Sequence, residues 1–286
     1  MAPRDRNIPT VRQRDLGARL RALRLDLNLT VEEVAERLLC SPTKISRLET
    51  ATRPPMLRDV RDLCTLYSVD EAKAKQLMEM AQKAREPGWW AKYEDLDMPY
   101  IGLEQDAASI TSYTMYYVPA LLQTERYTRA VIKGIAPKID TKILEDRIEA
   151  RMRRQKLLEK DEPPRYRVLM DESVLCRPIG GRAVMREQLD RVLDVGRRGK
   201  ATIQIIPFEI GAHAAQDSNF ILLDFDDVEL PPIAFVEGLA AHQYLEREED
   251  IDRYREAIEY LRDSALSPRE SKQRITEARD SYQGDR

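Results

Sequence analysis

The chain has 286 residues, which is long enough for two domains because a single hydrophobic core rarely grows to that size. Apolar residues make up 42% and charged residues 34%, so the chain can bury a core, yet no apolar run approaches the roughly 20 residues that span a bilayer. The sequence therefore excludes a protein that crosses a membrane with apolar helices.

The start of the chain and its cysteines narrow the class further. Residues 1–11 contain no apolar segment before a small-residue cleavage site, so we expect no secretory signal and a cytoplasmic, nucleoid-associated protein. Cys40, Cys64 and Cys176 are far apart and lack the CxxC spacing of zinc and redox sites. We therefore expect no metal and no cofactor.

The net charge of −3 conceals an asymmetry along the chain. Residues 1–85 contain 17 basic and 12 acidic side chains, a net charge of +5, whereas the remainder contains 30 and 38, a net charge of −8. A basic domain joined to an acidic one is the pattern expected when one end of a protein contacts nucleic-acid phosphates.

The first part of the chain is predicted to be a disordered arm followed by five short helices. Residues 1–12 are polar and rich in arginine, a composition that buries too little surface to become ordered. Apolar spacing and capping signals predict a domain over residues 13–86 with helices at about 15–28, 31–38, 42–50, 57–67 and 71–85. Thr30 and Glu33 form a capping box before the second helix, and Ser41 followed by Pro42 starts the third.

The third helix has the composition of a helix that reads DNA. Ile45 and Leu48 point inward, which leaves small polar and basic side chains on the outer face. Such a helix fits the major groove, where Arg47 can bind guanine in bidentate fashion. The start of the second helix and a residue beyond the third are expected to contact phosphates. The predicted DNA-binding residues are Thr30, Val31, Ser41, Thr43, Lys44, Ser46, Arg47 and Arg53.

Three segments at fixed separations, 20–24 (LRALR), 29–35 (LTVEEVA) and 45–49 (ISRLE), resemble the XRE helix-turn-helix family over residues 15 to about 69. The resemblance implies the fold of the phage repressors and a pair between Arg24 and Glu49 that holds the third helix in place. Each of these residues also lies one position past a buried stripe, so the two are expected to meet. Where the family has glycine, this chain has Leu39 and Ala51, so either turn differs in shape or carries left-handed strain.

The second part, residues 87–286, is predicted to be an α+β regulatory and dimerisation domain that begins after the Pro-Gly pair at 87–88. Short β-branched and aromatic runs predict strands at 166–170, 201–208, 219–225 and 233–237. Helices are expected at about 103–113, 123–133, 141–158, 182–197, 248–263 and 268–282. The fold class is therefore mainly α with a small sheet, in which a five-helix lambda-repressor-like domain precedes the α+β domain.

Segments of this second part, 118–124 (VPALLQT), 151–155 (RMRRQ), 171–175 (DESVL), 204–213 and 265–271 (ALSPRES), resemble the large C-terminal domain of antitoxin-like XRE regulators over about residues 89–282. The resemblance implies a repressor or an antitoxin-like regulator, often acting with a small partner protein. Ala120 stands where that family has glycine, which leaves the shape of its turn open.

Two features of the second part leave alternatives open. Trp89, Trp90, Tyr93, Tyr113, Tyr116 and Tyr117 either form a ligand or partner surface or pack as a core between the domains. His213 and His242 could in principle work with Asp171, Glu172, Asp217 or Glu237, but no catalytic motif accompanies them, so we expect no enzyme.

The function that we expect is sequence-specific regulation of transcription, with repression favoured over activation. A single short recognition helix covers few base pairs, so a homodimer on a double-stranded operator is predicted. The alternative is an antitoxin-like protein whose main role is to bind a small acidic partner protein, with DNA binding as autoregulation.

Overall fold

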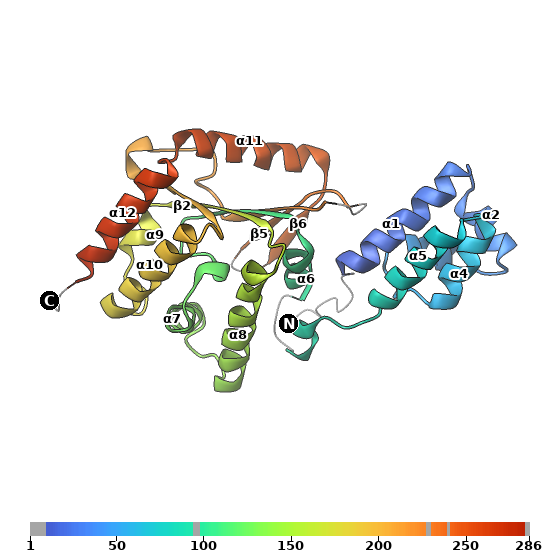
Figure 1. Ribbon diagram of the computed structural model, residues 1–286, viewed down its shortest axis with the longest axis horizontal. Coiled ribbons are helices and arrows are strands. Elements are labelled where there is room, and N and C mark those ends of the chain that lie inside the picture. Colours follow the sequence, from blue (N-terminus) through green and yellow to red (C-terminus); the bar gives the residue numbers. More distant parts are fainter. Residues whose placement is uncertain (1–9, 94–97, 227–229, 239–240, 284–286) are drawn as a thin grey trace. The chain divides into compact units, whose positions relative to one another are not determined.

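The computed structural model describes residues 10–93, 98–226, 230–238 and 241–283. The chain divides into two compact units (Figure 1). The first holds the chain up to Lys92 together with helix α6 (Met98–Asp106), and the second holds Ala107–Asp226 and the chain from Pro231 onward. No helix formed by the residues described is both long and apolar enough to cross a membrane.

The first unit contains the five expected helices: α1 (Val11–Asp26), α2 (Val31–Arg37), α3 (Pro42–Glu49), α4 (Leu57–Leu66) and α5 (Glu71–Lys83), followed by the 3-10 turn η1 (Trp89–Lys92). Helix α1 begins four residues before the expected Asp15, because Thr10 and Gln13 form a capping box that the prediction missed. Thr10 is therefore the N-cap of α1 and residues 11 and 12 are helical, while the remaining residues of the expected arm, 1–9, lie outside the described residues.

One apolar core joins these helices. Leu16 and Leu20 of α1 are fully buried and belong to one cluster with inward-facing residues of the other four helices. The burial of these apolar side chains is the main favourable contribution to the folding free energy of a small domain. The rest of the core consists of Val34, Ala35, Ile45, Leu48, Val60, Leu63, Cys64, Tyr67, Leu77 and Ala81.

Four successive helices end on a left-handed residue that is not glycine. The backbone φ is +54° at Asn28, +49° at Leu39, +55° at Ala51 and +52° at Ser68, and each residue lies two positions after the last residue of α1, α2, α3 or α4. After α2, the Leu39 and Cys40 amides donate to the Glu36 and Ala35 carbonyls, which is the hydrogen-bond pattern of a Schellman cap. The turns thus keep the shape that glycine would give, and Leu39 and Ala51 carry the strain.

The second unit is built on a six-stranded sheet in the order β3-β2-β1-β4-β5-β6. Strand β1 pairs in parallel with β2, which pairs in parallel with β3, and the other neighbours are antiparallel. The strands are β1 (Ser109–Thr114), β2 (Arg165–Asp171), β3 (Thr202–Ile206), β4 (Phe220–Asp224), β5 (Ile233–Glu237) and β6 (His242–Leu245).

Helices cover both faces of this sheet. Helix α11 (Glu248–Ser264) lies over one face, whereas α7 (Glu125–Ile135), α8 (Thr141–Arg154) and α10 (Arg182–Arg197) lie beneath the other (Figure 1). The short helix α9 (Ser173–Cys176) follows β2. Near α12 (Pro268–Ser281) the chain covers the edge of β3, because Ile205 accepts from the Leu266 amide and donates to the Ser271 hydroxyl. An edge covered in this way offers no pairing site to another strand.

The predicted helix at 103–113 is wrong in its second half. Helix α6 ends at Asp106, and residues 109–114 form β1, which lies between β2 and β4. Five of the six residues of β1 are buried, because helices cover both faces, so the strand lacks the alternation that marks a half-exposed strand. Strand β6 was not expected either, because it has only four residues.

Replacing Leu39 by glycine is expected to stabilise the first unit by about 1 kcal/mol, because it removes left-handed strain. Little packing is lost, since the Leu39 side chain is 95% exposed. Urea unfolding followed by tryptophan fluorescence measures this, because both tryptophans belong to the first unit. The control Glu36→Gly, at an exposed helical position, should instead cost about 1 kcal/mol. A loss of stability in both variants would contradict the conclusion that Leu39 carries backbone strain.

Candidate DNA-binding surface

Helix α3 is held by its inner face and presents its outer face to solvent. The Ser41 hydroxyl caps the helix by accepting from the Lys44 amide, and Pro42 occupies the first turn. Ile45 and Leu48 are buried in the core. Thr43, Ser46 and Arg47 are exposed, as the predicted surface requires. Among the residues described, the Arg47 guanidinium makes no hydrogen bond or ion pair, so it is available to a ligand.

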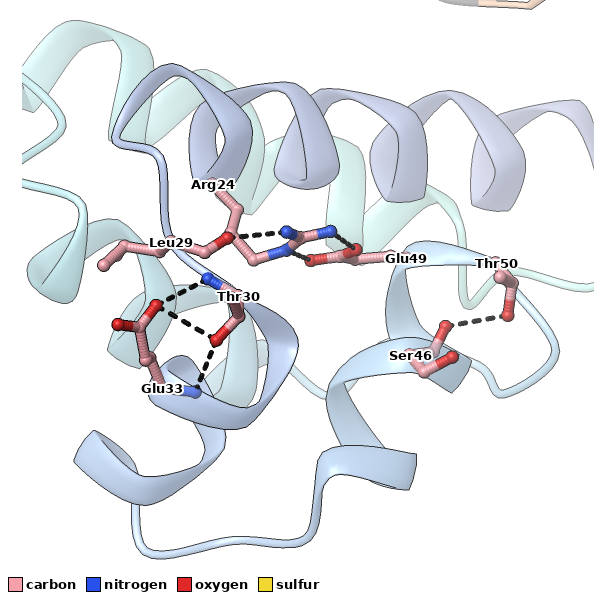
Figure 2. Close-up of polar contacts among 7 residues, drawn as sticks. All are labelled: Arg24, Leu29, Thr30, Glu33, Ser46, Glu49 and Thr50. Atoms are coloured by element: carbon pink, nitrogen blue, oxygen red, sulfur yellow. Dashed lines mark hydrogen bonds and ion pairs between the residues drawn. The ribbon is translucent and has the colours of Figure 1, made fainter.

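The Arg24–Glu49 pair is present and bidentate (Figure 2). Arg24 Nε lies 2.7 Å from Glu49 Oε1, and Arg24 Nη2 lies 2.8 Å from Glu49 Oε2. The remaining guanidinium nitrogen, Nη1, donates to the backbone carbonyl of Leu29 at 2.7 Å. One guanidinium therefore ties α1 to the last residue of α3 and to the segment that leads into α2.

This pair is deeply buried, which makes it sensitive to loss of either partner. The Arg24 and Glu49 side chains are only 8% and 5% exposed. The hydrogen bonds to Glu49 raise the pKa of the Arg24 guanidinium above its usual value. The hydroxyl of Tyr67 is buried nearby without a hydrogen-bond partner in the described part of the chain, and its pKa is raised by burial and by the charge of Glu49. An unpaired charge in these surroundings would be strongly destabilising.

Gly17 brings α1 and α3 into backbone contact, a feature that the sequence reasoning missed. A Cβ atom at this position would overlap the backbone carbonyls of Leu48 and Glu49. Neither carbonyl can rotate away as a side chain can, so only glycine allows this approach. A glycine inside an otherwise regular helical pattern was the available signal. Gly17 and the Arg24–Glu49 pair together fix the C-terminal end of α3 on α1.

Lys44 does not lie on the outer face with Thr43, Ser46 and Arg47, and in this respect the prediction was wrong. Its ammonium pairs with Asp59 of α4 at 2.7 Å, and the two side chains are 30% and 11% exposed. The partner lies 15 residues away in sequence and on another helix, so no periodic pattern could have shown it.

The predicted phosphate contacts at the start of α2 coincide with a capping box. The Thr30 hydroxyl accepts from the Glu33 amide, and the Thr30 amide donates to Glu33 Oε2 at 2.8 Å (Figure 2). The backbone hydrogen bond from Thr30 lowers the pKa of the Glu33 carboxyl. A phosphate would have to displace this carboxylate from Thr30, whereas Val31 is not part of the box. Arg53 is exposed, with one weak contact of 3.7 Å to the Met56 sulfur.

The aromatic residues proposed as a ligand or partner surface do not share one environment. Tyr113 is 1% exposed in the core between the sheet and α11, and Tyr93 is 3% exposed, so the surface role was wrong for both. Tyr116 is half exposed. The Tyr117 hydroxyl donates to Glu237, and burial raises its pKa to about 12. Trp89 and Trp90 meet edge to face with their ring centroids 5.7 Å apart.

Both histidines lie against aromatic rings, and Glu237 is the cross-strand neighbour of His242 in the β5–β6 pair. His213 Nε2 lies 3.3 Å from the Tyr113 hydroxyl, and the His242 ring packs against Phe235. Within the described ranges, no three His, Cys, Asp or Glu side chains are placed so that they could hold a metal ion.

In the segment 118–124, where Ala120 replaces the glycine of the resembled family, the chain forms the 3-10 helix Ala120–Leu122. This conformation is open to any residue. The buried amide of Gln123 donates to the Val118 carbonyl, and that of Gln188 donates to the Leu122 carbonyl. These bonds satisfy the backbone of a buried turn, and the replacement by alanine leaves its shape regular.

Comparisons with known families agree with this division of the chain. Residues 15–77 match a helix-turn-helix domain. Residues 98–277, more than half of the chain, match a domain of unknown function, DUF5753. The chain belongs to the DUF5753 family. Comparison with curated proteins and with solved structures gave no match.

This DUF5753 protein is thus a DNA-binding regulator of transcription at the general level that its helix-turn-helix domain supports. The helix-turn-helix match spans most of α1, all of α2 to α4 and the first half of α5, and so contains the Arg24–Glu49 pair and the exposed face of α3. The DUF5753 match spans all six strands, and its description assigns the domain no activity.

Removal of one partner of the buried pair, as in Glu49→Ala, is expected to destabilise the first unit by about 3–5 kcal/mol. The double variant Arg24→Met/Glu49→Leu should lose less, because no charge is then left buried alone. Urea unfolding followed by tryptophan fluorescence measures all three proteins. The exposed pair Arg58–Asp62 of α4, whose side chains are 78% and 38% exposed, is the control in the same unit: Asp62→Ala should cost less than about 1 kcal/mol. Equal small costs at both sites would contradict a structural role for Glu49.

Proposed function

We propose that this DUF5753 protein is a repressor that binds a double-stranded operator with α3 in the major groove. The observation that carries the proposal is the exposed outer face of α3, where Thr43, Ser46 and Arg47 project from a helix whose inner face is fixed by core packing and by the buried pair. A rigid helix with small polar residues and one unpaired arginine is suited to reading base edges.

The contacts divide into those that read sequence and those that position the protein. Arg47 can donate to guanine O6 and N7, while Thr43 and Ser46 can contact neighbouring base edges or a thymine methyl. Arg53, beyond the end of α3, is placed to neutralise a phosphate. The basic charge of residues 1–85, net +5, favours association with DNA at any sequence.

The second unit is proposed to dimerise the protein and to sense a ligand or a partner. Two recognition helices at half-sites one helical turn apart would give the specificity that one short helix lacks. The proposal assigns no catalytic role to the second unit, and it rests there on the size and separate core of this unit.

A small acidic partner protein is a second candidate for what the protein binds. Its charge complements residues 1–85, net +5, better than the remainder, net −8. In this alternative the partner would compete with DNA for the first unit, so that partner binding would relieve repression and DNA binding would serve autoregulation.

Substitutions on and beyond α3 test the reading role. Arg47→Ala is expected to relax base preference at one position of each half-site and to cost about 1–3 kcal/mol on the operator. Arg53→Ala should weaken operator and scrambled duplexes alike and flatten the dependence of affinity on salt. Fluorescence anisotropy on an operator selected from random duplexes measures both. If Arg47→Ala leaves both affinities unchanged, α3 is not the reading helix.

Sedimentation measures the predicted homodimer. The full chain should sediment as a dimer, both free and on operator DNA, and removal of the first 92 residues should leave the remainder dimeric. A monomer under both conditions would exclude paired half-site recognition.

A further inference from the structure

The ion pair between Lys44 and Asp59 lies at the edge of the surface assigned to DNA and has no place in the proposed function. Lys44 is the third residue of α3, the end of a recognition helix that enters the groove. Its ammonium points to Asp59 Oδ1, 2.7 Å away, in the first turn of α4.

We propose that Asp59 holds Lys44 away from DNA, so that the protein binds duplexes of any sequence with one phosphate contact fewer than its charge allows. This inference rests on the proposed DNA binding by α3. Asp59 acts as a positioning residue, and Lys44, which the sequence predicts to bind DNA, makes no contact with DNA.

The placement of both charges favours the closed pair. A cation in the first turn of α3 is unfavourable to the helix dipole, and the carboxylate of Asp59 compensates it. The same carboxylate lies in the first turn of α4, where a negative charge is favourable. Asp59 is only 11% exposed, so release of Lys44 to a phosphate would leave a mostly buried carboxylate without its partner.

The pair also bears on sequence discrimination. Each phosphate that a lysine neutralises releases counterions and adds affinity that carries no sequence information. A lysine kept on Asp59 adds none, and the reading of bases is left to the exposed side chains Thr43, Ser46 and Arg47. The structure thus combines a basic unit with a restraint on one of its cations.

Salt titrations on a mixed-sequence DNA duplex test this with the full chain. Asp59→Asn should free Lys44 and steepen the slope of log affinity against log salt by about 0.9 for each protomer bound. That slope corresponds to a further loss of roughly 3-fold in affinity for each protomer between 50 and 200 mM salt. Lys44→Gln should leave the slope at the wild-type value, and Lys44→Gln/Asp59→Asn should restore it.

Two controls separate this from other effects. Glu79→Gln on α5 changes the net charge by the same amount at an exposed position away from Lys44, and should leave the slope unchanged. Tryptophan fluorescence in urea establishes that each variant is folded. A lower slope in Lys44→Gln, by about 0.9, would mean that Lys44 contacts phosphate in the wild type and would overturn the inference. An unchanged slope in Asp59→Asn would also overturn it while leaving the proposed function intact, whereas a wild-type chain that binds no duplex overturns both.

Discussion

The Arg24 guanidinium is the constraint on which the position of α3 depends. Its three donor groups reach Glu49 at the end of α3 and the Leu29 carbonyl ahead of α2, so one side chain sets the positions of both helices of the motif relative to α1. Because two parallel hydrogen bonds, from Nε and Nη2, require the guanidinium and the carboxylate to be nearly coplanar, the pair fixes an angle as well as a distance. The outer face of α3 can then be small and polar, since it contributes nothing to holding the helix.

Local signals predicted the helices of the first unit well, because capping boxes and apolar stripes are formed by residues close to one another in sequence. The same reasoning placed Arg24 beside Glu49, since both flank stripes that must meet. This reasoning failed where the position of a side chain or the type of an element depends on contacts between residues distant in sequence, because such contacts leave no periodic pattern. Asp59 turns Lys44 from the outer face, and only the coverage of both sheet faces explains why residues 109–114 form a buried strand instead of the end of a helix.

The second unit shows why its chemistry is harder to predict than its fold. Its motif segments account for structure: Gln123 and Gln188 satisfy the buried backbone of the turn at 118–124, and Ser271 closes the edge of β3. Tyr113, which the sequence left between a ligand or partner surface and a core between the domains, lies in the core between the sheet and α11. Residues that serve the fold in this way identify the fold without identifying a ligand.

The contact at Gly17 has a consequence for how this protein can change over time. Since α1 meets α3 through the backbone carbonyls of Leu48 and Glu49, the seat of the recognition helix is independent of the side chains that the helix carries outward. In the proposed reading role of α3, mutations at positions 43, 46 and 47 can therefore change the DNA sequence that is bound without changing how the helix docks. New DNA targets would then be open to descendants of this gene through a few surface mutations, because the packing of α3 on α1 does not depend on these side chains.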